Sequence, residues 1–323
     1  MQWEEISSLY FATNSLFYIY TILFYICRLA EKHLKTSPLK LKFSPDWDPA
    51  GDEFSRAATA FKVGKDYQQS KKCLLRAVDC YKEIHSIFQA GKMLEQAVLV
   101  SRDMGEMEDI ASLAERGALM YRQVNKPESA SSLLEKAGKM IEKDLPGDAT
   151  GLYEKAADTV STEDRPNVSA DFVGRAARLH VRVSNWEKAI ACLRSEVAYR
   201  QEAGTSPSQA VLGLVLIELV REDVVAAEKA YKELGGYLDG TQVRAANNIF
   251  QVGLSMIDSI SQLLTSYCYL QGYNDQDYSQ VNDALNSTAI KELDLDFAKL
   301  AQKVPRPKQR TGDDDDDMGG GLC

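Results

Sequence analysis

A chain of 323 residues is longer than most single compact domains, so either two domains or one elongated array is expected. The composition, 45% hydrophobic and 26% charged, is that of an ordinary protein able to bury a core. The net charge of −9 excludes nucleic acid as an expected partner, because phosphate contacts need grouped Lys and Arg and no basic stripe with interleaved aromatics occurs.

Residues 1–27 form an atypical hydrophobic extension. No charged residue lies between Leu9 and Cys27, and this run approaches the roughly 20 apolar residues that cross a bilayer. Short polar residues interrupt it, and Glu4 and Glu5 stand where a signal peptide carries positive charge. Three interpretations stay open: a signal anchor that inserts the chain in a membrane, an additional buried or interfacial helix, and translated non-coding sequence.

From about Asp52 onward the sequence repeats with a period close to twenty residues. Each unit has large apolar residues, then a basic residue, then a small residue at one register. These small residues are Ala57, Ala77, Ala97, Gly117, Ala137, Ala156 and Ala176. Such a period fits one helix of about four turns plus a short turn, so two units make a helical hairpin. A small side chain at this register lets two antiparallel helices approach closely where they cross.

Short breaker segments separate the units, at 63–66, 125–128, 144–147 and 183–185. Each carries a Gly, a Pro, or an Asn or Asp that can end one helix or begin the next. No run alternates apolar and polar residues between hairpin signals, so essentially no strand is expected. The predicted fold is all-α, with a tetratricopeptide-like right-handed solenoid of antiparallel helix pairs over 28–203.

The pattern changes at the Gly-Thr-Ser-Pro segment, 204–207. Helices are predicted at Gln209–Arg221 and Asp223–Leu234, and a further block at Val243–Leu270. The twenty-residue register is less clear here, so 204–300 is predicted to be a C-terminal helical bundle that caps the solenoid.

The last segment, 301–323, is predicted to be a disordered acidic tail. It combines two prolines, a basic patch, five consecutive aspartates and four glycines, a composition that cannot form a packed element. Its ending is not a prenylation box, because the Cys of that box is fourth from the end.

The sequence carries no recognisable catalytic, cofactor or metal motif. A P-loop, a GxGxxG after a strand and a GxSxG elbow are all missing. The three histidines, His33, His85 and His180, are far apart, and the six cysteines match no zinc or disulfide spacing. We therefore expect reduced thiols in a cytosolic protein, no enzyme activity, no cofactor and no small-molecule substrate.

Several segments resemble the soluble NSF attachment proteins. Arg28–Lys62, RLAEKHLKTSPLKLKFSPDWDPAGDEFSRAATAFK, is similar to the first helix, loop and second helix of that family. The likeness continues through KAGKMIE, YEKAAD and RAARLHVRVSNWEKA, up to Ala189. The acidic run before Gly-Gly-Leu-Cys, with DFAKLAQKVP at 296–305, is most like the gamma isoform. The resemblance extends from about Arg28 to Cys323.

The resemblance implies an adaptor in membrane fusion, vesicle-mediated transport and intracellular protein transport. Proteins of this family bind the assembled SNARE four-helix bundle, which contains syntaxin-type SNAREs, and recruit the hexameric NSF ATPase, whose ATP hydrolysis separates spent SNAREs. The implied location is cytoplasmic, peripheral to the cytosolic face of membranes. The alternative is a generic tetratricopeptide-like scaffold for another partner, which the turn at Asn185–Ala189 would suit equally well.

The membrane-touching loop of the family falls at 38–47 of this chain. Apolar residues there alternate with lysines, which suits insertion next to anionic headgroups. The predicted membrane contacts are Leu39, Leu41, Phe43 and Trp47. Phe43 and Trp47 would also suit a simple cap on the core of the first hairpin.

Two further sets follow from the resemblance. The acidic-then-leucine ending that contacts the ATPase matches Asp313, Asp314, Asp315, Asp316, Asp317 and Leu322. An aspartate run also serves simply to keep a chain soluble. Because SNARE bundles are acidic, a cationic face is expected near the repeat alanines, at Lys136, Lys139, Lys155, Arg175 and Arg178. Lys and Arg also occupy any exposed helix face, so this set has an ordinary explanation too.

Overall fold

The computed structural model describes residues 25–35, 45–161, 165–238, 282–283 and 285–304. Every regular element in these ranges is helical, as predicted. The block at Val243–Leu270, and the hydrophobic run before residue 25, lie outside the described residues. Within the described ranges, no helix has both the length and the hydropathy needed to cross a bilayer.

The chain divides into two compact units, Met1–Phe172 and Val173–Cys323. The predicted solenoid, 28–203, and the predicted helical bundle, 204–300, are separated by a change in the repeat pattern and not by compactness. These two ranges stay predictions.

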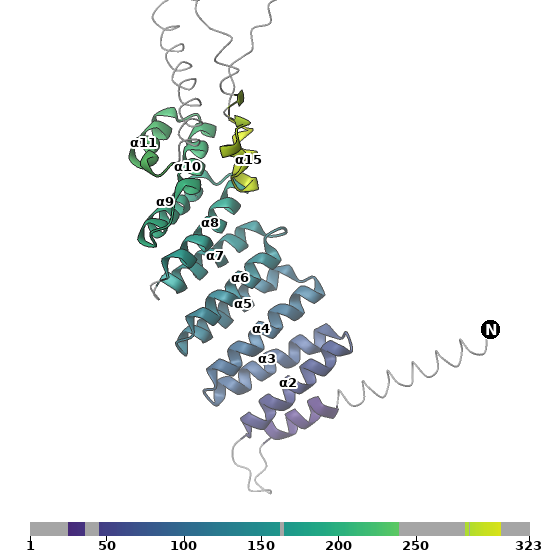
Figure 1. Ribbon diagram of the computed structural model, residues 1–323. Helices are drawn as coiled ribbons and strands as arrows, with labels where there is room; N and C mark the ends of the chain where they lie inside the picture. Colours follow the sequence, from purple (N-terminus) through teal and green to yellow (C-terminus); the bar gives the residue numbers. More distant parts are fainter. Residues whose placement is uncertain (1–24, 36–44, 162–164, 239–281, 284, 305–323) are drawn as a thin grey trace, which may run out of the picture. The chain divides into compact units, whose positions relative to one another are not determined.

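The first unit is a stack of antiparallel helices in chain order (Figure 1). After a helix over 25–34, its elements are α2 (Trp47–Val63), α3 (Tyr67–Glu83), α4 (Ile87–Met104), α5 (Met107–Gln123), α6 (Pro127–Ile141) and α7 (Pro146–Ser161). From α2 to α7 each helix packs on the next, and α4 also contacts α6 while α5 contacts α7. Alternate helices therefore share a layer, which confirms the predicted tetratricopeptide-like stack of helix pairs.

The small residues of the repeat are buried, as the twenty-residue register predicted. The six alanines have 0% exposure: Ala57, Ala77, Ala97, Ala137, Ala156 and Ala176. The seventh position, Gly117, is the tightest, because a Cβ added there would lie 2.6 Å from Cδ2 of Leu133 on the next helix. A larger side chain at this register would push neighbouring helices apart.

The turns of the first unit repeat with the same spacing. Lys65, His85, Gly105 and Asn125 all adopt positive φ, between 54° and 80°. The following N–H then donates to the carbonyl five residues back, as from Asp66 to Phe61 at 2.9 Å. This pairing is the Schellman motif, which satisfies carbonyls left open at a helix end. Only one of the four residues is a glycine.

The helix starts also follow the predicted breaker segments. Pro127 and Pro146, in two of those segments, each occupy the first position of their helices, where the missing N–H costs nothing. Pro166, which lies outside the predicted segments, starts α8 in the same way. Asp66 caps α3 by accepting the N–H of Gln69 at 3.1 Å.

Three tyrosines fill the space left by glycines between neighbouring helices of the first unit. A Cβ added to the glycine would lie 3.0–3.1 Å from the ring in the pairs Gly51–Tyr81, Gly91–Tyr121 and Gly138–Tyr153. All three hydroxyls donate to carboxylates: Tyr81 to Asp52 at 2.7 Å, Tyr121 to Glu95 at 3.1 Å, and Tyr153 to Glu142, just after α6, at 3.3 Å. Burial, with the neighbouring carboxylate, raises the pKa of Tyr81 and of Tyr121, so both phenols stay protonated and keep donating.

The second unit is built around α10 (Ser208–Val220), which contacts α9 (Trp186–Glu202), α11 (Val224–Leu234) and α15 (Leu295–Ala301). Its other described elements are the C-terminal half of α8 (Pro166–Arg182), the 3₁₀ turn η2 (Gly235–Tyr237) and α14 (Thr288–Lys291). Every residue of α10 from Ala210 to Leu219 is buried, as expected for a helix that is apolar on all sides. The predicted helices after residue 207 correspond to α10 and α11.

The segment 285–304 packs onto helices that precede it by some hundred residues. A Cβ on Gly213 would lie 3.0 Å from the ring of Phe297, so the glycine lets α15 approach α10 closely. Arg178 pairs with Asp294, and Nε of Arg182 donates to Oδ1 of Asp296 at 2.8 Å. Two arginines one turn apart on α8 thereby fix the start of α15.

Candidate functional site

His33, which precedes the predicted membrane-touching loop, is held against Asp46, which lies near the end of that loop. The N–H of Asp46 donates to the carbonyl of His33 at 3.0 Å, and the Asp46 carboxylate lies 3.9 Å from Nδ1 of His33. The described residues on either side of 36–44 are therefore held together beside the start of α2. Trp47 is the first residue of α2 and is half-buried. The other predicted contacts, Leu39, Leu41 and Phe43, lie outside the described residues.

The helix over 25–34, which precedes this loop, contacts α3 through a pair of thiols. Sγ of Cys27 lies 3.3 Å from Sγ of Cys73, which is buried. The hydrogen bond with Cys27, together with burial, raises the pKa of Cys73, so that thiol stays protonated at neutral pH. The same hydrogen bond lowers the pKa of Cys27.

The structure distributes the predicted SNARE-facing cations over different surfaces. Lys136 and Lys139 lie on α6, in the layer that contains α4, whereas Lys155 lies on α7, in the layer that contains α5. Arg175 and Arg178 lie on α8, in the second unit. Within the first unit, only Lys136 and Lys139 are brought together.

These cations lie beside carboxylates. Nζ of Lys136 is 2.9 Å from Glu95 on α4, and Nζ of Lys155 is 2.6 Å from Glu115 on α5. Lys139 pairs within its own helix, 2.7 Å from Glu135. Exposed pairs of this kind contribute little stability, so they can exchange one carboxylate for another. Arg178 differs, because its side chain is only 25% exposed and its partner Asp294 starts α15.

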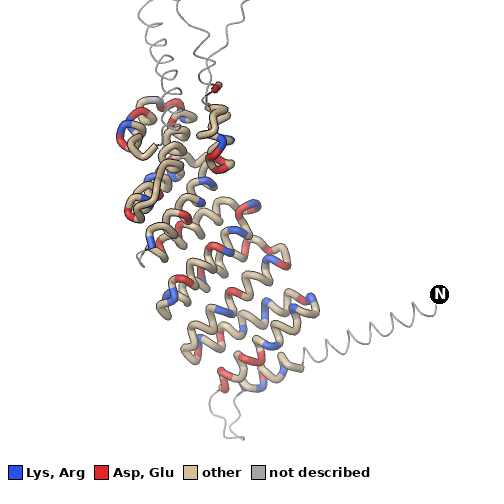
Figure 2. The backbone as a smooth tube through the Cα atoms, viewed as in Figure 1, with Lys and Arg blue, Asp and Glu red and all other residues tan. Residues whose placement is uncertain are grey.

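Further ion pairs join alternate helices of the first unit, and sequence reasoning missed them. Lys62 on α2 lies 3.5 Å from Asp103 on α4, and Lys71 on α3 lies 2.7 Å from Glu106 next to α5. Such partners are separated by 35 to 41 residues, about two repeat units, and that spacing is the signal that could have found them. Lys and Arg residues are accordingly interspersed with Asp and Glu residues along the helices of this unit (Figure 2).

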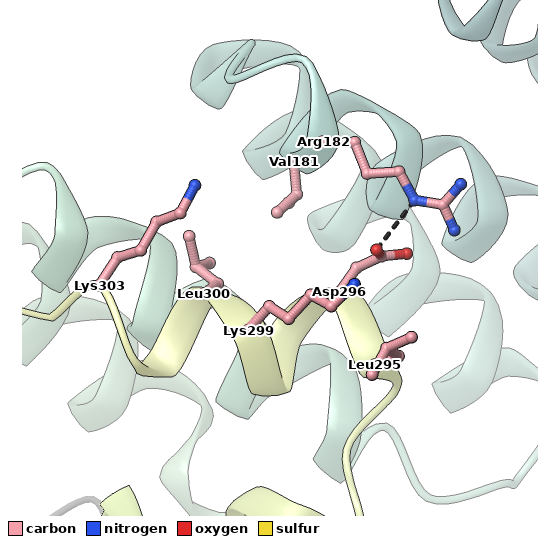
Figure 3. Close-up of a pocket in the computed structure, with 7 residues that line it drawn as sticks. All are labelled: Val181, Arg182, Leu295, Asp296, Lys299, Leu300 and Lys303. Carbon is pink, nitrogen blue, oxygen red and sulfur yellow. Dashed lines mark hydrogen bonds and ion pairs between the residues drawn. The ribbon is translucent and has the colours of Figure 1, made fainter. Parts of the chain in front are cut away.

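A groove of about 420 Å³ lies in the second unit, between the end of α8 and α15 (Figure 3). Val181, Leu295 and Leu300 supply apolar surface, and Arg182, Lys299 and Lys303 supply positive charge. Asp296 also lines it and is paired with Arg182. We call this the α15 groove. The sequence did not predict it, because its two sides are more than a hundred residues apart.

The family model for "Soluble NSF attachment protein, SNAP" matches residues 26–248. This chain belongs to the SNAP family. The gamma-soluble NSF attachment protein of Arabidopsis thaliana is 25% identical to it over 284 residues, which cover 86% of this chain and 91% of that relative. The family resemblance in the sequence is thereby confirmed. The SNAP match contains the predicted membrane loop and all five predicted cations, and it ends before the acidic tail.

Two solved structures overlap with this SNAP-family chain at low TM-scores. Aspartyl phosphate phosphatase F from Bacillus subtilis has a TM-score of 0.34 and 15% identity, covering 73% of this chain and 65% of that one. BtubC (BKLC) from P. vanneervenii has a TM-score of 0.33 and 12% identity, covering 78% of this chain and 95% of that one. Neither likeness carries an argument about function.

Proposed function

We propose that this chain is an adaptor that binds assembled SNARE complexes and recruits and stimulates the NSF ATPase for their disassembly. The observation that carries the proposal is the SNAP-family match over 26–248, which includes all the described helices of the first unit. A stack of helix pairs offers the long surface that a rod-like helical bundle requires. The adaptor holds its partners and hydrolyses nothing itself.

The SNARE-binding part of the proposal rests on Lys136 and Lys139. They lie on one helix of one layer, and their carboxylate partners, Glu95 and Glu135, are partly exposed and so can be exchanged for acidic residues of the SNARE bundle. Lys136→Glu/Lys139→Glu should weaken SNARE binding roughly tenfold at low salt, with a smaller effect at high salt.

Lys155→Glu is the matched control, since this lysine is equally exposed but lies in the other layer. Equal weakening by both variants would contradict a contact confined to the α4/α6 layer. Reversal of Arg178 is a poor test, because it would also break the ion pair with Asp294 that fixes α15.

The recruitment of the ATPase is assigned to the tail. Its aspartates, Asp313–Asp317, would be drawn to a basic surface of NSF at long range, and Leu322 would dock in an apolar groove there. Deletion of 313–323 should leave SNARE binding intact and abolish NSF recruitment in a pull-down. Normal NSF-dependent disassembly by the truncated chain would refute this assignment.

Membrane contact is assigned to the loop at 38–47. Leu41→Ser/Phe43→Ser should reduce co-flotation with anionic liposomes and leave thermal unfolding unchanged. Leu119→Ser on α5 is a suitable control, since Leu119 is 56% exposed and lies on another part of the first unit. Unchanged flotation of the double variant would leave Phe43 and Trp47 as a cap on the first hairpin.

We propose a peripheral location on the cytosolic face of membranes, with the run at Leu9–Cys27 outside the bilayer. Alkaline carbonate extraction of membranes from cells that express the full chain tests this. The chain should be released into the supernatant. Retention in the pellet would identify the run as an anchor.

One experiment tests the adaptor as a whole. The full chain, added to ATP-depleted cytosol, should recover SNAREs and NSF together, and ATP should then release them. Binding to short isolated C-terminal peptides, with no recovery of NSF, would instead identify a general tetratricopeptide-like scaffold.

A further inference from the structure

The α15 groove has no role in the function proposed above, yet it exposes an apolar side chain and two lysines to solvent. Leu295 stands at its edge with 66% of its surface exposed, beside Leu300 and Val181. Lys299 and Lys303 are one helical turn apart and both are exposed. Neither forms an ion pair with any residue that the structure describes. Arg182, by contrast, is already paired with Asp296.

This combination defines the chemistry of a ligand. Two unpaired ammonium groups next to the exposed side chain of Leu295 fit a segment that carries several carboxylates followed by an apolar residue. A nucleic acid does not fit, because Asp296 lines the same groove and the chain carries a net charge of −9.

The chain itself contains such a segment. The five aspartates at 313–317 are followed by Met318 and Leu322, and the run begins ten residues after Lys303. A span of that length reaches up to roughly 35 Å when extended, so the tail can return to the groove from which the chain departs. A tether this short gives an effective concentration on the order of millimolar, at which even a weak contact is largely formed.

We propose that the acidic tail, Asp313–Asp317 with Leu322, docks on the α15 groove of its own chain. The aspartates pair with Lys299 and Lys303, and the leucine covers the apolar surface around Leu295. Docking itself does not depend on the function proposed above. Its consequence does: a docked tail is withheld from NSF, so the ATPase has to compete with the groove for it.

Zero-length carbodiimide cross-linking of the full chain tests the docking, since it joins carboxylates to amines only when they touch. In the monomer fraction, mass spectrometry should find Asp313–Asp317 joined to Lys299 or Lys303. Lys303 is also near the tail in sequence, so proximity alone has to be separated from docking. Leu295→Ser does this, because it keeps both lysines and removes only the exposed apolar contact. This variant should lower the cross-link yield several-fold, whereas Leu119→Ser should not.

Proteolysis of the tail is a second measurement, and it does not depend on how close Lys303 lies to the tail in sequence. Docking should slow proteolysis of the tail in the full chain. Lys299→Glu/Lys303→Glu should remove this protection, while Lys229→Glu/Lys232→Glu, at two exposed lysines of α11, should not. High salt should act like the groove variant.

Three outcomes would overturn the proposal. The first is that Leu295→Ser leaves the cross-link yield unchanged. The second is that Lys299→Glu/Lys303→Glu leaves the rate of tail proteolysis unchanged. The third is that cross-links are found only in dimers, which would make a second copy the occupant. An NSF pull-down with Lys299→Glu/Lys303→Glu is read separately and should show increased recruitment. If the cross-links form as expected but deletion of 313–323 leaves recruitment normal, docking stands and the proposed role of the tail fails.

Discussion

The two units of this chain bury their cores in different ways. In the first, no helix is central: each helix from α2 to α7 contacts its neighbours, and the core is a series of similar interfaces. In the second, one helix, α10, is buried along its length, and α9, α11 and α15 pack around it. The stabilising contacts of the first unit are therefore spread over many helix interfaces, whereas those of the second unit are concentrated around α10.

The units also differ in where their charges lie. The first unit carries ion pairs at its surface, between alternate helices. The second unit buries carboxylates: Glu218 lies 3.0 Å from Arg221, and Glu196 lies so close to Gly174 that an added Cβ would be 2.8 Å from its Oε2. Burial raises the pKa of both Glu196 and Glu218, although nearby arginines oppose the shift. Protonation of Glu196 and of Glu218 should therefore stabilise the second unit.

The largest expected effects test whether damage stays within a unit. Leu94→Ala in α4 and Leu212→Ala in α10 each remove a fully buried side chain and should cost about 2–5 kcal/mol. Hydrogen exchange should show lost protection mainly around α4 for the first variant and throughout the second unit for the other. Uniform loss of protection in both variants would mean that the two units unfold as one.

A smaller effect is expected where helices of the first unit meet most closely. Gly117→Ala should destabilise the chain by about 1–3 kcal/mol, because the new methyl group would overlap Leu133. Gly151→Ala in α7 is the matched control: nothing lies within 4 Å of an added Cβ, so the better helix propensity of alanine should stabilise the chain by up to about 1 kcal/mol. Urea unfolding of the two variants measures the free energy of unfolding, which should fall for Gly117→Ala and rise for Gly151→Ala.

The charge difference between the units predicts a pH dependence. Since the pKa of Glu196 is raised in the folded state, the folded chain binds this proton more tightly than the unfolded chain. Its contribution to stability is therefore present at low pH and is lost as the pH rises through the folded pKa. Glu196→Gln should flatten the change in urea midpoint between about pH 7 and about pH 5. A slope identical to wild type would show that Arg178 and Arg200 fully offset the burial.

The smallest expected effects concern the repeated turns. Lys65 adopts φ 60°, a conformation that glycine reaches without strain, so Lys65→Gly should stabilise the first unit by about 0.5–1 kcal/mol. Gly105→Ala should have the opposite sign and similar size, because Gly105 has φ 80° with open space around it. Thermal melting would detect both shifts. If both variants changed the stability in the same direction, positive φ at these two turns would not explain the effects.

Much of the architecture followed from local pattern. The twenty-residue spacing of small residues predicted the helix pairs, and Ala57 and Ala97 are buried as that register requires. The prolines and the aspartate cap marked helix starts correctly. The left-handed turn at Lys65 could not be predicted in this way, because lysine does not favour that conformation and only the helix-end hydrogen bonds impose it.

The candidate surfaces were less predictable. A helical period places Lys136 and Lys155 on outward positions, but it does not say which layer each helix joins. Successive helices lie in different layers of the stack, so these two lysines separate. The α15 groove lay beyond sequence reasoning for a related reason, since it needs α15 to pack beside α8.

The sequence by itself determined that this chain is helical, that its first part repeats in pairs of helices, and that it belongs to the SNAP family, because these depend on residue types at short spacing. Only the tertiary structure decided which charges are paired, which carboxylates are buried and where Lys299 and Lys303 meet an apolar surface. The ion pairs that join different helices connect residues 35 to 116 positions apart, which is beyond the reach of any pattern within one helix.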